Sequence, residues 1–264
     1  MSKIEYVQAD GARIGYRDDG DGPALVLVHG TGGDGEDNWG EVLRGLPGRR
    51  ILRSDYAGSG LTEDATERLT LDRLADQVLA AADHAGVETF DLAGFSLGAA
   101  VALRIAARHP DRVRRLVSLG GFVTGGDPRS RLQFDHWVEL AGRDREALAR
   151  LILLTGFSAD FVAGMGDLDA VVAQMVEVTH WEGMARQAML DKIVDVSADL
   201  AAIRAPTLVL GNRHDQMVPP SASVALAAGI AGARLGWIDG PHLSPMECPE
   251  AVAAAIAGFL GASG

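Results

Sequence analysis

Cysteine and lysine are scarce in this chain of 264 residues. Cys248 is the single cysteine, so no internal disulfide can form and the fold must be held together by packing. Lys3 and Lys192 are the only lysines, and the formal net charge is −12 at pH 7. Because nucleic-acid affinity depends on clustered basic side chains that neutralise phosphates, this composition argues against a nucleic-acid partner.

Long apolar runs are missing as well. The chain begins with alternating apolar and polar residues, whereas a signal peptide needs a basic segment followed by an apolar one. Every apolar stretch is interrupted by Arg, Asp or Gly well before membrane-spanning length. No group of Cys and His residues has the spacing of a metal site. We therefore expect a soluble, cytoplasmic protein that binds neither a membrane nor a metal ion.

The chain instead contains a regular alternation of short apolar runs and helical patterns. With 47% hydrophobic residues, a chain of this length can bury a large core in one domain. Apolar runs bounded by turn residues predict eight strands: residues 3–9, 12–18, 24–30, 49–55, 89–94, 113–120, 206–211 and 233–240. The first two suggest an antiparallel pair. Helical patterns such as residues 69–86 and 248–260 predict an α/β fold whose sheet is mostly parallel.

The interval between the fourth and fifth parallel strands breaks this alternation. It carries three helical patterns and no convincing strand: residues 131–142, 145–156 and 168–195. We interpret residues 122–198 as a helical insertion in a core formed by residues 1–121 and 199–264. No internal repeat or low-complexity linker suggests a second, independently folded domain.

The sequence GFSLG places a serine between two glycines where an apolar strand gives way to an alanine-rich helix. In a G-x-S-x-G turn the serine has normally unfavourable backbone dihedrals, and Gly94 and Gly98 allow strand and helix to approach closely. The hydroxyl of Ser96 is thereby exposed as a nucleophile. The helix that follows directs its N-terminal amides, that of Leu97 first, toward the place where an oxyanion would develop.

A second glycine-rich turn, HGTGG, follows the first buried strand. Its Thr31 backbone amide is the candidate to complete an oxyanion hole with that of Leu97. The alternatives are a turn without a ligand or a nucleotide-binding loop. The second alternative fails because the Walker Lys-Ser/Thr pair is missing, and Asp34, Glu36 and Asp37 would repel phosphate.

A base and an orienting acid complete the predicted chemistry. His242 lies in a Gly-Pro-rich loop after the last strand, and Asp215 follows the fifth parallel strand at the same sheet edge. A carboxylate there can hold the imidazole in the tautomer that deprotonates the serine. The other candidates are His29 and His214 for the base, and Asp239 and Asp127 for the acid.

Taken together, HGTGG, SDYAGSG, GFSLG, GNRHDQMVPP and GPHLSPMECPE resemble the α/β-hydrolase fold superfamily over essentially the whole chain. The resemblance implies an eight-stranded, mostly parallel sheet with a helical cap inserted after the sixth strand. It also implies a triad of Ser96, Asp215 and His242, and no cofactor. Ala57 departs from the commoner family pattern, which has Arg at that position.

The nucleophile narrows the chemistry that the resemblance implies. Family dehalogenases and epoxide hydrolases have Asp at the turn, and hydroxynitrile lyases of this fold follow the catalytic His with Lys, where this chain has Leu243. Ser96 suits hydrolysis of an ester, thioester or lactone through an acyl-enzyme. Cofactor-free perhydrolysis, C–C bond cleavage, acyl transfer, cyclisation and non-catalytic binding of a small molecule remain open.

Substrate choice is expected to depend on the inserted helices. They carry apolar, adaptable side chains that favour a small, partly apolar substrate: Phe134, Trp137, Phe157, Phe161, Met165, Met175, Trp181, Met184 and Met189. The first candidates for substrate contact are Phe134, Trp137, Trp181 and Met184. A small molecule is the expected partner, and the sequence leaves a homodimer open.

Overall fold

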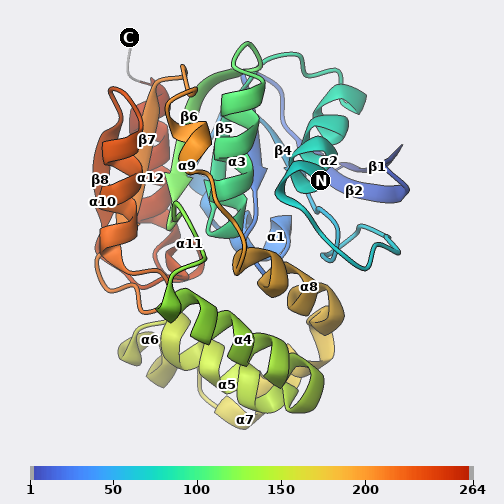
Figure 1. Cartoon of the computed structure of the whole chain (residues 1–264), viewed down its shortest axis with the longest axis vertical. Helices are drawn as coiled ribbons and strands as arrows, with labels where there is room; N and C mark the ends of the chain where they lie inside the picture. Colours follow the sequence, from blue (N-terminus) through green and yellow to red (C-terminus); the bar gives the residue numbers. More distant parts are fainter. Residues whose placement is uncertain (1–2, 262–264) are drawn as a thin grey trace.

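The computed structural model describes residues 3–261, which fold around one sheet of eight strands (Figure 1). The strands lie in the order β1-β2-β4-β3-β5-β6-β7-β8. Their bounds are β1 Lys3–Ala9, β2 Ala12–Asp19, β3 Ala24–Val28, β4 Arg50–Ser54, β5 Phe90–Phe95, β6 Val113–Leu119, β7 Thr207–Asn212 and β8 Arg234–Ile238. β2 pairs antiparallel with β1 and β4, and all other pairs are parallel. This confirms the predicted fold class.

The central strands are apolar because helices cover both faces of the sheet. All five residues of β3, with the sequence ALVLV, are buried, whereas the edge strand β1 is half exposed. One face packs against α2 (Leu71–His84), α3 (Leu97–Arg108), α9 (Ser197–Leu200) and α10 (Pro220–Gly229). The other face packs against α1 (Gly35–Trp39), the 3-10 helix η1 (Val42–Gly45) and α12 (Pro249–Gly261).

Local signals explain where α2 begins and ends. The Thr70 hydroxyl accepts a hydrogen bond from the Arg73 amide, which satisfies one of the free amides of the first turn. Gly86, just after the helix, has φ of +70°, a left-handed conformation that costs glycine little. The expected stop at Gly86 therefore matches the structure.

Six helices lie between β6 and β7, and the first five of them form a separate layer below the sheet in Figure 1. They are α4 (Pro128–Arg143), α5 (Arg145–Gly156), α6 (Ala159–Gly164), α7 (Leu168–Val178) and α8 (Trp181–Asp191), called here the α4–α8 segment. These helices share an apolar core of their own, which includes Trp137, Leu148 and Trp181. The insertion therefore follows the sixth strand, whereas its predicted limits of 122–198 stay a prediction.

The chain segments that lead into and out of the α4–α8 segment pair with each other. The amide of Gly125 donates to the Val194 carbonyl at 3.0 Å, and that of Val196 donates to the Val123 carbonyl at 2.9 Å. Thr124 and Asp195 form an antiparallel bridge between them.

The helical pattern predicted at residues 168–195 forms two helices, α7 and α8, because the chain turns at Thr179, whose ψ is 134°.

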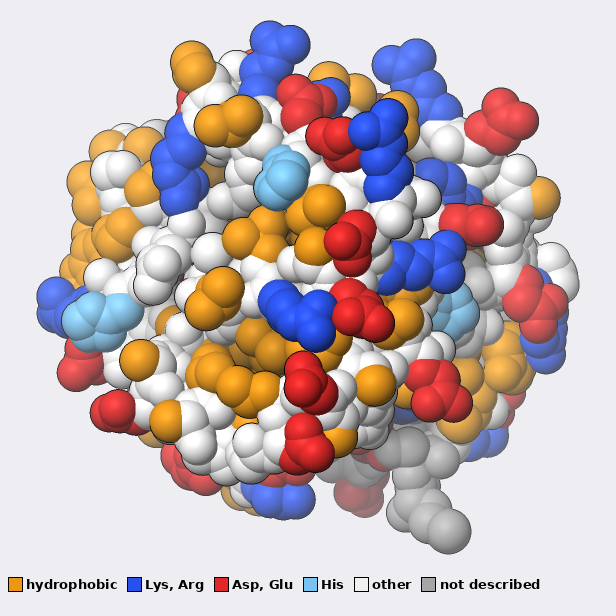
Figure 2. Space-filling view, turned by 90° about the horizontal axis from the view of Figure 1, so that it is seen from below, with side chains coloured by type: hydrophobic (Ala, Val, Ile, Leu, Met, Phe, Trp, Pro, Cys, Tyr) orange, Lys and Arg blue, Asp and Glu red, His pale blue; other side chains and the backbone are white. Residues whose placement is uncertain are grey.

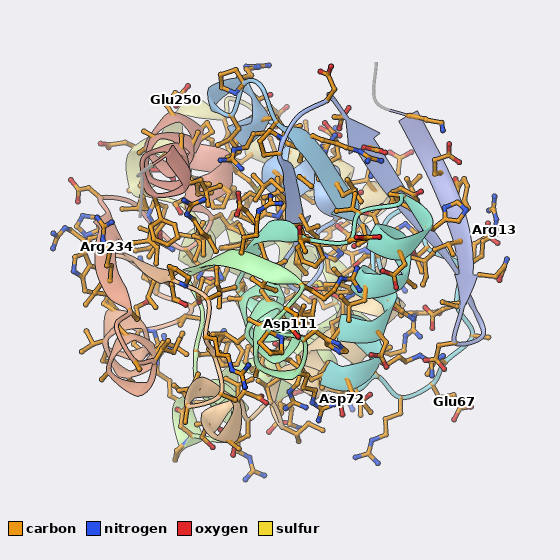
Figure 3. The ribbon with its side chains drawn as sticks, turned by 90° about the horizontal axis from the view of Figure 1, so that it is seen from above. Arg13, Glu67, Asp72, Asp111, Arg234 and Glu250 are labelled. Carbon is orange, nitrogen blue, oxygen red and sulfur yellow. The ribbon has the colours of Figure 1, made fainter. Side chains whose placement is uncertain are left out.

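Charged side chains are present at both ends of the molecule. The end formed by the α4–α8 segment shows apolar side chains among charged ones (Figure 2). Leu132 of α4 and Leu154 of α5 are exposed. The opposite end carries charged side chains, with Asp111 of the α3–β6 connection near the centre and Arg234 at the periphery (Figure 3). Within residues 3–261 no helix is long and apolar enough to cross a membrane. The cytoplasmic location stays a prediction.

Candidate active site

Ser96 lies in a strained turn between β5 and α3, with φ 54° and ψ −119°. A positive φ is unfavourable for a residue with a side chain, so the surrounding structure must impose it. A Cβ atom on Gly94 would overlap the carbonyl oxygen of Gly98, and one on Gly98 would overlap that of His29. Glycine is therefore required on both sides of Ser96, for the reason inferred from the GFSLG motif.

Ser96, His242 and Asp215 form one hydrogen-bonded series. The Ser96 Oγ lies 3.1 Å from His242 Nε2, and His242 Nδ1 lies 2.7 Å from Asp215 Oδ2. In the tautomer with the proton on Nδ1, the imidazole donates to Asp215 and its Nε2 can accept the serine proton. The imidazole is almost fully buried and packs 5.1 Å from the Phe95 ring. Its orientation is thus fixed from two sides.

Backbone amides after β7 hold the Asp215 carboxylate. Its Oδ1 accepts hydrogen bonds from the amides of Met217 at 2.9 Å and Val218 at 2.7 Å, which leaves Oδ2 for His242. Asn212 at the end of β7 donates to the His242 carbonyl at 3.3 Å. These bonds hold the Asp215 carboxylate and the loop that carries His242 in a fixed relation.

The structure places the rival residues elsewhere. His214 Nε2 lies 2.9 Å from Asp239 Oδ1, and both side chains are exposed. Asp127 caps the N-terminus of α4 by accepting from the amides of Arg129 and Ser130. Among the described residues, the carboxylate hydrogen-bonded to His242 is that of Asp215, and its role as the orienting acid stays a prediction.

His29 is a fully buried structural residue beside the site. Its Nδ1 lies 2.8 Å from the Gly30 carbonyl oxygen, and its ring stacks on Tyr56 with centroids 3.9 Å apart. The Tyr56 hydroxyl donates to the His29 carbonyl at 2.9 Å. Burial lowers the pKa of the His29 imidazole, because a charged ring would lose its hydration there. His29 therefore supports the turn that follows it as a neutral ring.

The turn after β3 approaches the nucleophile closely. A Cβ atom on Gly30 would lie 3.0 Å from the Ser96 Cβ, so the next residue, Thr31, begins beside the serine. Leu97 is the first residue of α3, and its amide has no carbonyl within the helix to bond. The amides of Thr31 and Leu97 are thus on the two chain segments that flank Ser96. Their role as an oxyanion hole stays a prediction.

Helix α8 contacts the same turn, which we call the Thr31–Gly33 loop (residues 31–33). The Thr31 hydroxyl donates to Asp191 Oδ2 at 2.6 Å, and the Gly32 amide donates to Gln187 Oε1 at 2.9 Å. Sequence reasoning missed both partners, which lie about 160 positions away along the chain. Burial raises the pKa of Asp191 to about 7, partly offset by the bond from Thr31.

A cavity of about 310 Å³ opens at Ser96 and His242 between the sheet and the α4–α8 segment. Of the four predicted contact residues, Phe134, Trp137 and Met184 line it. Trp181 differs from the expectation, because its buried indole packs inside the α4–α8 segment and donates to the Val176 carbonyl at 2.9 Å. Other apolar residues complete the lining, among them Phe157, Met165, Met175, Met217, Leu243 and Met246.

Asp37 gives this cavity a carboxylate. Among the described lining residues, only Asp37 and His242 have ionisable side chains. Partial burial and the neighbouring carboxylates of Asp34 and Asp55 raise the pKa of Asp37 to about 6. The carboxylate is therefore mostly ionised at pH 8, and the cavity offers no cation to a negatively charged substrate.

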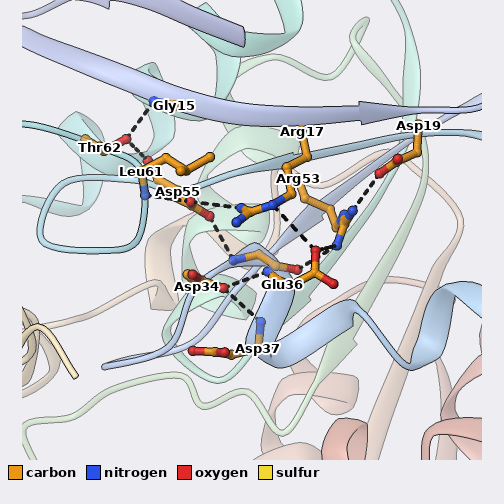
Figure 4. Close-up of polar contacts among 11 residues, drawn as sticks. Gly15, Arg17, Asp19, Asp34, Glu36, Asp37, Arg53, Asp55, Leu61 and Thr62 are labelled. Carbon is orange, nitrogen blue, oxygen red and sulfur yellow. Dashed lines mark hydrogen bonds and ion pairs between the residues drawn. The ribbon is translucent and has the colours of Figure 1, made fainter. Parts of the chain in front are cut away.

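A polar cluster fixes the short helix α1 that carries Asp37 (Figure 4). The fully buried Asp55 carboxylate accepts from the Gly35 amide at 2.8 Å and from Arg17 Nη1 at 3.1 Å. Asp34 caps α1 by accepting from the amides of Glu36 and Asp37. Since both carboxylates bond to α1 or to its first residues, the position of Asp37 at the cavity is set by the core.

Within residues 3–261, no group of three or more His, Cys, Asp or Glu side chains is arranged to hold a metal ion. The prediction that the protein uses no cofactor is not tested by this arrangement.

Comparison with known proteins places this geometry in a family context. A family model described as alpha/beta hydrolase fold matches residues 23–249. The chain is 45% identical over 260 residues to the pyrrolizixenacetamide deacetylase of Xenorhabdus hominickii, covering 97% of this chain and 98% of that protein. A hydrolase from Pseudomonas aeruginosa PA01 matches with a TM-score of 0.88 and 30% identity, covering 98% of both chains. The enol-lactonase from Burkholderia xenovorans LB400 matches with a TM-score of 0.87 and 27% identity, covering 98% of this chain and 100% of that one.

Proposed function

Since this chain belongs to the α/β hydrolase fold family and is a hydrolase, we propose that it cleaves a small, partly apolar acyl substrate through an acyl-enzyme on Ser96. The observation that carries the proposal is the series from Ser96 Oγ through His242 to Asp215, which opens into an apolar cavity. This arrangement provides a nucleophile, a base with a fixed tautomer and room for an acyl group.

Each step can be assigned to an atom of the site. His242 Nε2 takes the Ser96 proton while Oγ bonds to the substrate carbonyl carbon, and the amides of Thr31 and Leu97 stabilise the oxyanion. When the tetrahedral intermediate collapses, the bond to the leaving group breaks and His242 delivers the proton to that group. Water then attacks the acyl-enzyme in the same way, releasing the acid and free Ser96. One oxyanion donor is typically worth about 10²–10³ in kcat.

Esters, thioesters and lactones are the first substrate class, because their leaving groups depart readily. A second candidate is an N-acyl amide, and the 45% identity with a protein named as a deacetylase of an acetamide supports it. Amide cleavage depends more strongly on protonation of the leaving nitrogen by His242. The apolar side chains of the α4–α8 segment, which we propose to be a substrate-binding cap, favour a hydrophobic acyl or amine portion.

The test is a panel of p-nitrophenyl esters, thioesters, lactones and acyl anilides of graded chain length, with Ser96→Ala as the matched control. We expect turnover of at least one ester or amide series and loss of turnover in the variant, with the melting temperature retained. A fluorophosphonate probe should label Ser96 in the wild-type protein. Tight binding of a small molecule with neither labelling nor turnover would refute the proposal and favour a non-catalytic binding protein.

A further inference from the structure

Gln187 of α8 joins two loops of the core through all of its polar atoms. Its Oε1 accepts from the Gly32 amide at 2.9 Å, and its Nε2 donates to the Ala57 carbonyl at 3.1 Å and to Ser59 Oγ at 2.8 Å. The side chain is fully buried. Because both polar atoms of this buried amide are hydrogen-bonded, the Gln187 side chain is fixed in place and holds the Thr31–Gly33 loop in a defined position.

Asp191, one turn further along α8, holds the residue before Gly32. Its Oδ2 accepts from the Thr31 hydroxyl at 2.6 Å, and the side chain is 1% exposed. Residues four apart lie on the same face of a helix, so Gln187 and Asp191 together present two acceptors to two successive residues of the loop. Helix α8 thus accepts two hydrogen bonds from the loop, one from the Thr31 hydroxyl and one from the Gly32 amide.

The loop depends on such support because glycines surround Thr31. Gly32 has φ of +75°, which glycine adopts at little cost. Glycine can also adopt many other backbone conformations, so Gly32 alone does not fix the path of the loop. On its other side, Gly30 is held by a hydrogen bond from its amide to Asn38 Oδ1 at 2.8 Å. The core thus fixes the start of the loop, and α8 fixes Thr31 and Gly32.

Helix α8 itself is pressed against the core. A Cβ atom on Gly183 would overlap the carbonyl oxygen of Gly58, so the two backbones are in direct contact. Met184 lines the cavity, and a Cβ atom on Gly32 would lie 2.9 Å from its Cε. One helix therefore forms part of the acyl pocket and contacts the loop that carries the Thr31 amide.

We propose that Gln187 and Asp191 are positioning residues for the oxyanion hole: they hold the Thr31–Gly33 loop so that the Thr31 amide faces the oxyanion. This inference rests on the proposed serine-hydrolase function. Because an oxyanion forms only in the transition state, displacement of this amide lowers kcat and leaves substrate binding unchanged.

Three variants and a control separate positioning from folding. Gln187→Met removes both polar atoms at similar volume, Thr31→Val removes the hydroxyl and keeps the backbone amide, and Thr31→Ser restores the hydroxyl. The control, Arg186→Gln, lies on the same helix and breaks the 2.9 Å ion pair with Asp64 without touching the loop. Rates are expressed per site titrated by a fluorophosphonate at Ser96, so that misfolded molecules do not count.

The readouts are kcat and KM for the best p-nitrophenyl ester, the inhibition constant of a short alkylboronic acid, and the melting temperature. Boron bonds reversibly to Ser96 Oγ, and a boron hydroxyl then occupies the oxyanion position. We expect Gln187→Met and Thr31→Val to lower kcat and weaken the boronic acid at least tenfold in parallel, with KM within about twofold. Thr31→Ser should recover most of both, and Arg186→Gln should change only the melting temperature.

Two results would overturn the inference. If kcat per titrated site in Gln187→Met and Thr31→Val stays within twofold of Arg186→Gln, the contacts are merely structural. If KM rises while kcat and boronic acid affinity hold, α8 acts on substrate binding instead. A wild-type protein that neither labels at Ser96 nor turns over any substrate would refute the proposed function itself, and this inference with it.

Discussion

Asp191 is a buried carboxyl group whose ionisation should destabilise the fold. Its side chain is 1% exposed, Oδ2 accepts from the Thr31 hydroxyl, and Oδ1 has no hydrogen-bond partner among the described residues. No cation is among the causes that shift its pKa, and burial raises that pKa to about 7. The nearby Tyr56 phenol, also buried, has a raised pKa to which the Asp191 charge contributes. The substitution Asp191→Asn removes the charge with little change in shape.

The sign of the effect follows from proton linkage. The folded protein binds the Asp191 proton more tightly than the unfolded chain, whose ordinary pKa is 3.8. The carboxyl therefore costs nothing below about pH 4, becomes increasingly destabilising as the pH rises, and reaches its full cost above the folded pKa of about 7. A shift of about three units corresponds to about 4 kcal/mol, an upper figure because buried sites relax and admit water.

The assay is urea unfolding of wild type and Asp191→Asn at pH 5 and pH 8. We expect the stability of the variant relative to wild type to rise by about 2–3 kcal/mol between these pH values. Any constant effect of the new amide cancels in this difference. Asp21→Asn, an exposed position between β2 and β3, is the matched control and should show little change. A relative stability that is equal at both pH values would refute the buried charge as its cause.

Three further predictions concern the site and its support. Asp215→Asn should lower kcat by about 10³–10⁴ with KM little changed, because His242 is no longer held in the tautomer that can accept the serine proton. Asp239→Asn should retain activity, and the reverse result would show that Asp239, not Asp215, is the orienting acid. Gly94→Ala should destabilise the protein by about 3 kcal/mol or more in urea unfolding, while Gly142→Ala, which has open space, should not. Asp37→Asn should reduce the preference in kcat/KM for a thiocholine ester over its uncharged analogue by about three- to tenfold at pH 8, and an unchanged ratio would remove Asp37 from substrate recognition.

The sheet and the Ser96 turn could be predicted because their signals are local. A run such as ALVLV, apolar on both faces, is typical of a strand that is covered on both sides. In GFSLG, the two glycines allow a backbone turn that a side chain at either position would block. His242 and Asp215 could be chosen by their place after strands, since parallel strands deliver such loops to one edge. The structure adds the 2.7 Å contact that distinguishes Asp215 from Asp239.

The contribution of α8 could not be predicted, because it depends on helical phase. Residues 168–195 have one continuous helical pattern, but the chain turns at Thr179 and a new helix begins at Trp181. The break resets which side chains face the core. It places Trp181 inside the α4–α8 segment, whereas Met184 faces the cavity and Gln187 faces the Thr31–Gly33 loop. A polar residue within such a pattern carries no sign of which loop it will bond.

In the mechanism that we propose, one helix links substrate choice to catalysis. Met184 shapes the cavity, and Gln187 and Asp191 bond the loop that carries Thr31, so a shift of α8 changes both at once. A larger acyl group that displaced Met184 would press on a helix whose backbone contacts Gly58 and whose side chains bond Thr31 and Gly32. Poorly fitting substrates should then lose kcat as well as affinity. Selection among substrates would thus occur in the transition state, where a misplaced amide costs the most.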